Sequence, residues 1–351
     1  MHTTRHITLL IADLIPPPGF AMPVAMPALD GLLTASHTKL TAGCTLEDAL
    51  LAEFGTDGYA PIAAITRLAD YPETSTVGRE KTWLRADPVH FAISRDNMQL
   101  FDSHVVKPTE SEIQAIAEAL NTHFVDEGLV VHYPNAARGY LQIKTNDVPI
   151  TTPIWAMGNA SVFDNLPRIT TKSRTNWRAR TNEIQMLLHD HPVNLAREAA
   201  GVVPINGLWL WGGGSLNNFD GGCEYEHVVA RLALARGLAA ACDCPQTTLP
   251  VSLEAWLANP AAKVTNTLVV LHTASREIRA QDRALWPIEL ANIDRDWIAP
   301  AIAALNNGTL NSLTIVIPNE AKTLIIEARA NSLITRIKRL FASKKSIRDF
   351  A

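Results

Sequence analysis

The sequence predicts an α/β fold in which both ends of the chain build a central, mostly parallel sheet and an α+β domain is inserted between them. Short, continuously apolar runs near both ends are typical of strands buried on both faces: residues 7–12, 267–271 and 313–317. Helical patterns alternate with these runs, as in parallel sheets. The length of 351 residues exceeds what one core usually supports, which favours two domains.

The composition is that of an ordinary soluble globular protein. It is 47% hydrophobic and 19% charged with a net charge of −4, so no basic excess points to nucleic acid. No apolar run reaches the ~20 residues of a membrane span, and the N-terminus does not resemble a secretion signal. The chain contains only four cysteines, which we expect to be reduced and structural in a cytoplasmic protein: Cys44, Cys223, Cys242 and Cys244.

Several helices are expected from amphipathic or Ala-rich patterns, over residues 45–54, 62–68, 226–241 and 286–305. The clearest helix spans residues 109–124, because Thr109 and Glu112 fit a capping box and one face stays apolar. The chain becomes polar over residues 73–81, which we take as the first domain boundary.

Residues 83–96 alternate like a half-buried strand and carry an unusual density of charge. The charged or titratable residues are Arg85, Asp87, His90, Arg95 and Asp96. A solvated face explains some of these side chains, but we do not expect it to explain all five.

Residues 182–215 combine a helix, clustered donors, a strand and three glycines. The helix should end near His191-Pro192. Asn194, Arg197 and Asn206 then surround residues 208–211, an apolar run expected to be a strand of the core sheet. Glycines at the carboxyl end of such a strand let backbone N–H groups approach a ligand.

A different interpretation of the same stretch stays open. The glycines then form a tight turn without a ligand, and the guanidinium of Arg197 pairs with an internal acid such as Glu183 or Glu198.

The motifs His191-Pro-Val-Asn194, Arg197, Pro204-Ile-Asn206 and Trp211-Gly-Gly-Gly resemble those of archaeal-type cofactor-independent phosphoglycerate mutases of the alkaline phosphatase superfamily. Residues 83–96 and 182–214 together resemble more closely the bacterial RpfE-type regulatory proteins. The resemblance implies an alkaline-phosphatase-like core of residues 1–78 and 201–328 and a cap of residues 79–200. It also implies a cleft that binds a phosphorylated metabolite or another anion, through His90, Arg95, His191, Asn194, Arg197, Asn206, Gly212 and Gly214.

Enzymes of that superfamily hold two metal ions with Asp and His residues and use a Ser or Thr nucleophile. The candidate ligands here are Asp13, His272, Asp282 and Glu320, and the candidate nucleophile by order is Thr66. Four ligands are too few for two ions, so we expect no metal cofactor and a non-catalytic, regulatory protein. The alternative is an active mutase or phosphatase with an altered Mn or Zn site.

The C-terminal residues 329–351 predict a basic amphipathic helix. Such a helix docks on its own domain, or it meets a protein partner or an anionic membrane surface. A third hypothesis is therefore an interaction protein that recruits a partner through this tail.

Overall fold

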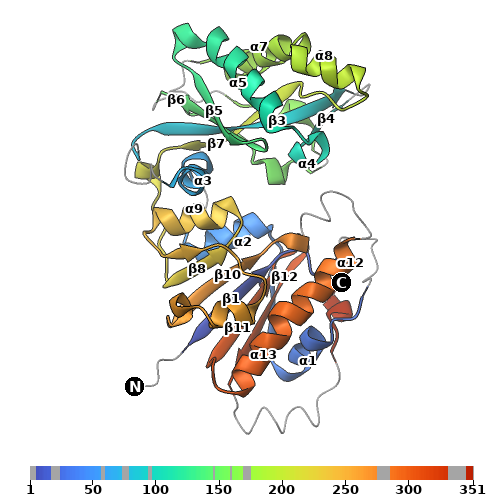
Figure 1. Ribbon diagram of the computed structural model, residues 1–351, viewed down its shortest axis with the longest axis vertical. Coiled ribbons are helices and arrows are strands. Elements are labelled where there is room, and N and C mark those ends of the chain that lie inside the picture. Colours follow the sequence, from blue (N-terminus) through green and yellow to red (C-terminus); the bar gives the residue numbers. More distant parts are fainter. Residues whose placement is uncertain are drawn as a thin grey trace. The chain divides into compact units, whose positions relative to one another are not determined.

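The computed structural model describes residues 5–16, 24–56, 60–72, 79–93, 97–144, 147–158, 160–168, 175–274, 285–330 and 345–350. The chain divides into two compact units (Figure 1). Unit 1 comprises residues 1–57 and 221–351, and unit 2 comprises residues 58–220.

Unit 1 contains a seven-stranded, mostly parallel sheet in the order β2-β12-β11-β1-β10-β8-β9. Its strands are β1 (His6–Ile11), β2 (His37–Ala42), β8 (His227–Ala230), β9 (Gln246–Thr247), β10 (Asn266–Leu271), β11 (Ser312–Ile317) and β12 (Lys322–Arg329). Strand β1 lies between β10 and β11 and is parallel to both. The three apolar runs therefore form adjacent strands, which confirms the predicted sheet. Strands β12 and β2 extend it antiparallel.

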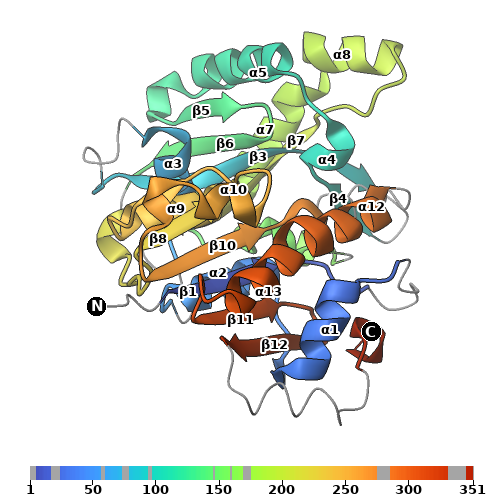
Figure 2. The same cartoon turned by 60° about the horizontal axis from the view of Figure 1, so that its bottom comes forward.

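Helices of unit 1 cover this sheet (Figures 1 and 2). They are α1 (Pro27–Ala35), α2 (Leu46–Glu53), α9 (Ala233–Ala241), α10 (Leu253–Leu257), α12 (Leu285–Ile293) and α13 (Ala299–Asn306), with the short 3-10 segments η5 (Pro260–Ala262) and η7 (Ile347–Phe350). A π-helical turn, η6 (Asp294–Ile298), joins α12 to α13. The expected helix over residues 286–305 is thus present with one wider turn in its middle.

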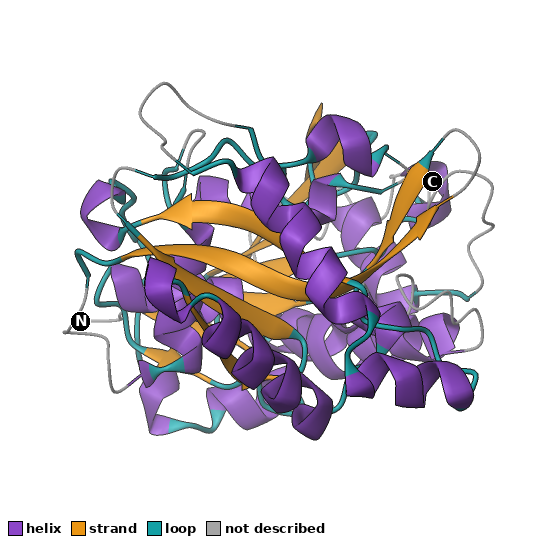
Figure 3. Cartoon of the chain, turned by 90° about the horizontal axis from the view of Figure 1, so that it is seen from above, coloured by secondary structure: helices purple, strands orange, loops and turns teal. Residues whose placement is uncertain are grey.

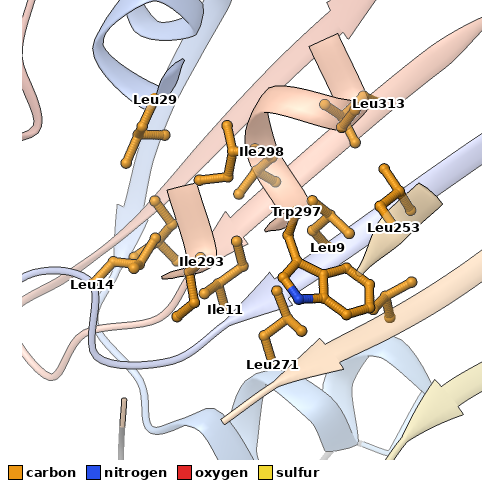
Figure 4. Close-up of a cluster of buried hydrophobic side chains, with 14 of the residues drawn as sticks. Leu9, Ile11, Leu14, Leu29, Leu253, Leu271, Ile293, Trp297, Ile298 and Leu313 are labelled. Atoms are coloured by element: carbon orange, nitrogen blue, oxygen red, sulfur yellow. The ribbon is translucent and has the colours of Figure 1, made fainter. Parts of the chain in front are cut away.

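The main core of unit 1 lies between one face of the sheet and α1, α10, α12 and α13 (Figure 4). Leu9 and Ile11 of β1 meet Trp297 of η6 in this core. Thr8 and Leu10, whose side chains alternate with these on β1, are also buried, and α2 packs against β1. Both faces of the central strand are therefore covered, as its continuous apolar run indicates.

Unit 2 contains a five-stranded antiparallel sheet centred on β3. Its strands are β3 (Thr82–Ile93), β4 (Met98–Phe101), β5 (Val130–Asn135), β6 (Arg138–Ile143) and β7 (Gly207–Gly214). Its helices are α3 (Ile62–Asp70), α4 (Ser103–Val106), α5 (Glu110–His123), α6 (Val162–Asn165), α7 (Trp177–His189) and α8 (Pro192–Ala199), with the 3-10 segments η2 (Val125–Glu127), η3 (Ile154–Ala156) and η4 (Leu216–Asn218). Figure 3 shows the helices and strands in a third view.

Two of the expected assignments were wrong, one for β7 of unit 2 and one for β8 of unit 1. Strand β7 was expected in the parallel sheet, but it pairs antiparallel with β3 in unit 2. The continuous apolar run misled because both faces of this antiparallel strand are buried: Leu208 and Leu210 enter the core beneath α5 and α7, and Trp209 and Trp211 are buried as well. Residues 227–230 were expected to be helical, but they form β8, paired with β10.

The unit boundaries differ accordingly from the expected ones. Helix α3 and strand β7 belong to unit 2, so the chain changes unit after residues 57 and 220 instead of 78 and 200. The capping box of α5 is present as predicted, with Thr109 as N-cap and Glu112 at the third helical position.

Of the predicted basic tail helix, residues 331–344 and 351 lie outside the described residues. The short η7 that follows contacts α1, where the backbone N–H of Ile347 donates to Oδ1 of Asp30 at 2.8 Å. In the described part of the chain, no helix combines the length and the apolar character needed to cross a membrane.

Candidate functional site

The predicted metal ligands of unit 1 follow the ends of adjacent parallel strands. Asp13 follows β1, His272 follows β10, and Glu320 follows β11. Because these strands are parallel and neighbouring, their carboxyl ends meet at one edge of the sheet, where α/β folds hold ligands. The fourth candidate, Asp282, lies outside the described residues.

The residues at this edge take part in local structure. The carbonyl oxygen of Asp13, whose φ is +55°, accepts a hydrogen bond from the indole of Trp286 at 3.1 Å. The side chain of Asn319 accepts one from the backbone N–H of Ala321 at 2.9 Å, and Glu320 is exposed. Among the described residues, no three His, Cys, Asp or Glu side chains come together in a group that could hold a metal ion.

Thr66, the candidate nucleophile, lies on α3 in unit 2. Its hydroxyl is buried and donates to the carbonyl oxygen of Ile62 at 2.8 Å, one helical turn earlier. A Thr side chain in this arrangement is a normal feature of a buried helix. It gives no sign of an activated nucleophile, which would need a neighbouring base.

Arg197, the expected anion clamp, is buried, and each of its nitrogens donates to another group. Nε donates to the carbonyl oxygen of Val203 at 2.8 Å, and Nη2 donates to that of Val106. Nη1 donates to Oε2 of Glu112 at 2.8 Å. The internal acid is therefore Glu112, and neither Glu183 nor Glu198 has this role.

The two asparagines of the motif are also used within unit 2. Both amide hydrogens of Asn194 are engaged, by the carbonyl oxygens of Leu188 (2.7 Å) and Ile205 (2.8 Å), and its Oδ1 accepts from the N–H of Ile205. The side chain of Asn206 bonds to both backbone groups of Phe91, at 2.7 and 3.0 Å. These two bonds continue the β3–β7 pairing beyond its last residue pair, Val89 and Gly207.

The predicted histidines and glycines have comparable roles. His191 is the N-cap of α8, where Nδ1 accepts from the N–H of Val193 at 3.3 Å. Burial lowers the pKa of His191, which favours this neutral, accepting form. His90 bonds to the carbonyl oxygen of Pro204 at 3.0 Å.

The glycines form the irregular end of β7, with φ of +62° at Gly212 and +147° at Gly214, and the N–H of Gly212 donates to Thr151 at 3.1 Å. Arg95, the remaining predicted ligand-binding residue, lies outside the described residues.

A buried ionic network, which the sequence did not predict in detail, lies on the face of β3 opposite α5. Nη2 of Arg85 lies 2.6 Å from Oδ1 of Asp87, and both side chains are buried. The indole of Trp211 donates to Oδ2 of Asp87 at 2.8 Å, and the guanidinium of Arg85 lies over the same indole, 4.9 Å from the ring centroid. The high density of charge in residues 83–96 indicated that Arg85 and Asp87 have a specific role. It did not indicate that Trp211 is their partner.

A second ion pair continues the network from α3 to β6. Asp70 receives two hydrogen bonds from Arg138, at 2.8 and 2.6 Å, and one from the Tyr140 hydroxyl at 2.5 Å. Burial alone would raise the pKa of Asp70, but these bonds and the charge of Arg138 outweigh it, and the pKa is lowered. Burial and the charge of Asp70 raise the pKa of Tyr140.

Cationic and aromatic side chains of unit 2 gather on α3, on β5, and on and just before β3. The guanidinium of Arg67 lies 4.3 Å from the ring centroid of Trp83, and Trp83 contacts His132 edge to face at 5.7 Å. Burial lowers the pKa of His132, and the positive charges of Arg67 and Lys81 lower it further. We call Arg67, Lys81 and His132, with Trp83, the cationic cluster. It concentrates positive potential around a partly exposed imidazole.

Comparison with known proteins gives a similarity of fold. No family model and no curated protein matches the chain. It is similar in structure to the PH0037 protein from Pyrococcus horikoshii, with a TM-score of 0.51 and 13% identity over 93% of this chain and 88% of that one. A second similar structure is the cofactor-independent phosphoglycerate mutase from Thermoplasma acidophilum DSM 1728, with a TM-score of 0.49 and 14% identity over 99% and 98%. The resemblance to RpfE-type regulatory proteins stays a prediction.

Proposed function

We propose that this chain is a non-catalytic protein of phosphoglycerate mutase-like architecture that binds a phosphorylated metabolite or a related small anion and acts in regulation, as the RpfE-type resemblance implies. The mixed α/β architecture of unit 1 and the sequence motifs around residues 182–215 support the architectural part. The cationic cluster supports the binding part, and the resemblance to RpfE-type proteins supports the regulatory part.

The observation that carries the non-catalytic part is the side chain of Asn319. In the family that the sequence resembles, this strand end supplies metal ligands, but here an amide closes a local turn onto Ala321. Two-metal phosphoryl transfer needs carboxylates and imidazoles around both ions, because the ions stabilise the charge that develops on the phosphoryl oxygens. A neutral amide engaged in its own turn is a poor replacement.

The cationic cluster is the site that we propose for the anion. Arg197 is not the proposed anion-binding residue, because all three nitrogens of its guanidinium donate to groups within unit 2. Lys81 is exposed and lies in the same positive field as the partly exposed His132. An arriving phosphate would bring negative charge to this field, so it would raise the pKa of His132 and add a charge-assisted hydrogen bond.

Isothermal titration of the full chain with 3-phosphoglycerate, inorganic phosphate and sulfate tests this proposal. We expect the first two to bind, and Lys81→Gln to weaken binding about tenfold or more, because a hydrogen bond to a charged group contributes about 1.5–3 kcal/mol. Lys263→Gln, which removes an exposed lysine of unit 1, is the matched control and should bind normally. Equal binding by both variants would place the anion elsewhere, and no binding of any phospho-anion would refute the proposed function.

The alternative function is an active metal-dependent mutase or phosphatase. It is favoured by one observation, that Asp13, His272 and Glu320 follow neighbouring strands at one edge of the sheet. With Asp282 they would hold Mn²⁺ or Zn²⁺, and such an ion would polarise a phosphoryl oxygen. Metal analysis of the protein after dialysis against Mn²⁺ and Zn²⁺ distinguishes the two: this alternative requires stoichiometric metal that is lost in Asp13→Ala.

A further inference from the structure

Three of the four cysteines of the chain lie near one another in unit 1. Cys223 precedes β8, and Cys242 and Cys244 lie in the loop between α9 and β9. Strands β8 and β9 are parallel neighbours, with Val228 paired to Gln246, so the segments that lead into them run side by side. This pairing brings together thiols that are 21 residues apart in the sequence.

The thiols of Cys223 and Cys244 converge on one atom. Their sulfur atoms lie 3.5 and 3.2 Å, respectively, from the carbonyl oxygen of Tyr225, which accepts from either thiol, and the single proton of Cys244 can instead be donated to the sulfur of Cys223. Cys223 is partly exposed, whereas Cys244 is buried. The thiol of Cys223 can therefore react with a solute, whereas the neighbouring thiol of Cys244 is shielded from solvent.

The electrostatic surroundings distinguish the two thiols. The hydrogen bond from Cys244 lowers the pKa of Cys223 to about 7, although burial and the nearby carboxylate of Glu224 oppose this. The pKa of Cys244 is raised by Cys223, by burial and by the charge of Cys242. On the α2 side, the hydroxyl of Tyr225 donates to Glu53, and its pKa is raised, so it stays a neutral neighbour. A partly exposed thiolate beside a protonated thiol is the arrangement of a reactive cysteine and its resolving partner.

We propose that Cys223 and Cys244 form a reversible redox site that reacts with small peroxides and closes to a disulfide. The thiolate of Cys223 attacks one peroxide oxygen, the O–O bond breaks, and the leaving oxygen takes up a proton. Cys223 is then a sulfenic acid. Cys244 loses its proton and attacks the Cys223 sulfur, the S–O bond breaks, and water leaves as the S–S bond forms. The two thiols lose two electrons in total, and the peroxide gains them.

The disulfide would act where the chain enters unit 1. Cys223 lies three residues after Asp220, the last residue of unit 2, and the N–H of Gly222 donates to the carbonyl oxygen of Phe54 at 2.9 Å. A covalent bond from Cys223 to the loop after α9 would fix this entry segment to the sheet of unit 1.

Titration of the reduced, full-length protein with hydrogen peroxide, followed by non-reducing peptide mapping, tests the proposal. We expect one linked peptide pair containing Cys223 and Cys244, lighter by two hydrogen atoms and restored by dithiothreitol. Cys44→Ser is the control and should leave the linkage intact, because the thiol of Cys44 lies beside Thr323 on β12. Cys244→Ser should stop the reaction at a sulfenic acid on Cys223, detectable with dimedone.

The rate of alkylation of Cys223 by iodoacetamide, measured against pH, is a second readout. A midpoint near pH 7 that rises in Cys244→Ala, which removes the donor, supports the role of Cys244 as hydrogen-bond donor. A midpoint near that of a free thiol, about 8.5, together with random or intermolecular disulfides, would overturn the proposal. A dominant Cys223–Cys242 linkage would overturn the assignment of Cys244.

Discussion

Nη1 of Arg197 lies 2.8 Å from Oε2 of Glu112, across 85 residues of sequence. Glu112 also accepts from the N–H of Thr109 at 2.8 Å as part of the capping box of α5. Burial opposes its ionisation, but the bonds from Thr109 and Arg197 lower its pKa. A single carboxylate thus closes the start of α5 and ties it to α8, which gives Arg197 a structural role.

Arg197→Met should therefore destabilise unit 2 strongly. The change leaves the partly exposed carboxylate of Glu112 without its counter-charge and the carbonyl oxygens of Val106 and Val203 without their donor, which should together cost about 3–5 kcal/mol. Urea unfolding followed by circular dichroism measures this cost. Arg178→Met removes an exposed arginine of α7 and is the control, with an expected change within ~0.5 kcal/mol. Equal stability of the two variants would show that Arg197 is not a structural anchor.

Asp70 should make the stability of unit 2 depend on pH. Its folded-state pKa is lowered, so its contribution is present above the unfolded-state pKa and is lost as the pH falls through the folded value. Asp70→Asn should cost about 3 kcal/mol at pH 7, since the uncharged amide keeps one accepting oxygen but turns an NH₂ group towards the donors of Arg138 and Tyr140. The difference from wild type should shrink below about pH 4.

Chemical denaturation at several pH values measures this difference. Asp126→Asn, at an exposed position of η2, should leave stability unchanged throughout. A difference between wild type and Asp70→Asn that stays constant from neutral to acidic pH would contradict the assigned ion pair.

The parallel sheet of unit 1 could be predicted from the sequence, because β1, β10 and β11 are short runs buried on both faces. The assignment of β7 failed for a physical reason. Its run of apolar residues reports burial on two faces, but not which neighbouring strand it pairs with, and here that neighbour is β3. Strand β8 was missed because its Val and Ala residues are followed closely by the Ala-rich α9. The change from the two-residue period of a strand to the 3.6-residue period of a helix is therefore hidden.

The close approach of β6 to β3 depends on Gly139. A Cβ at this position would lie 2.3 Å from the carbonyl oxygen of Ala86 and 2.5 Å from the ring of Tyr133. Gly139→Ala should therefore destabilise unit 2 by about 1–3 kcal/mol, as overpacking does. Gly31 of α1 has no heavy atom within 4 Å of its Cβ position, so Gly31→Ala should instead gain about 0.5–1 kcal/mol. Thermal unfolding of both variants tests the contrast, which fails if the two changes have the same sign.

The candidate site was harder to predict than the sheet. The sequence indicated that Arg197, Asn194 and Asn206 matter, but polar groups used within a fold and polar groups used for a ligand have the same residue types. Only the hydrogen-bond partners of such a group distinguish the two roles. The guanidinium of Arg197 donates to Val106 and Glu112, which are far away in the sequence. The cationic cluster escaped notice because its members are far apart in the sequence: Arg67 lies on α3, Lys81 lies just before β3 and His132 lies on β5.

Turnover of 3-phosphoglycerate in the presence of Mn²⁺ tests the central claim most directly. The purified full-length protein is incubated with substrate, and formation of 2-phosphoglycerate is followed through an enolase-coupled assay. We predict no turnover above background, because Asn319 stands where the resembled family has metal ligands and the described residues assemble no metal-binding group. Metal-dependent turnover that disappears in Asp13→Ala would contradict this account and establish the chain as an active enzyme.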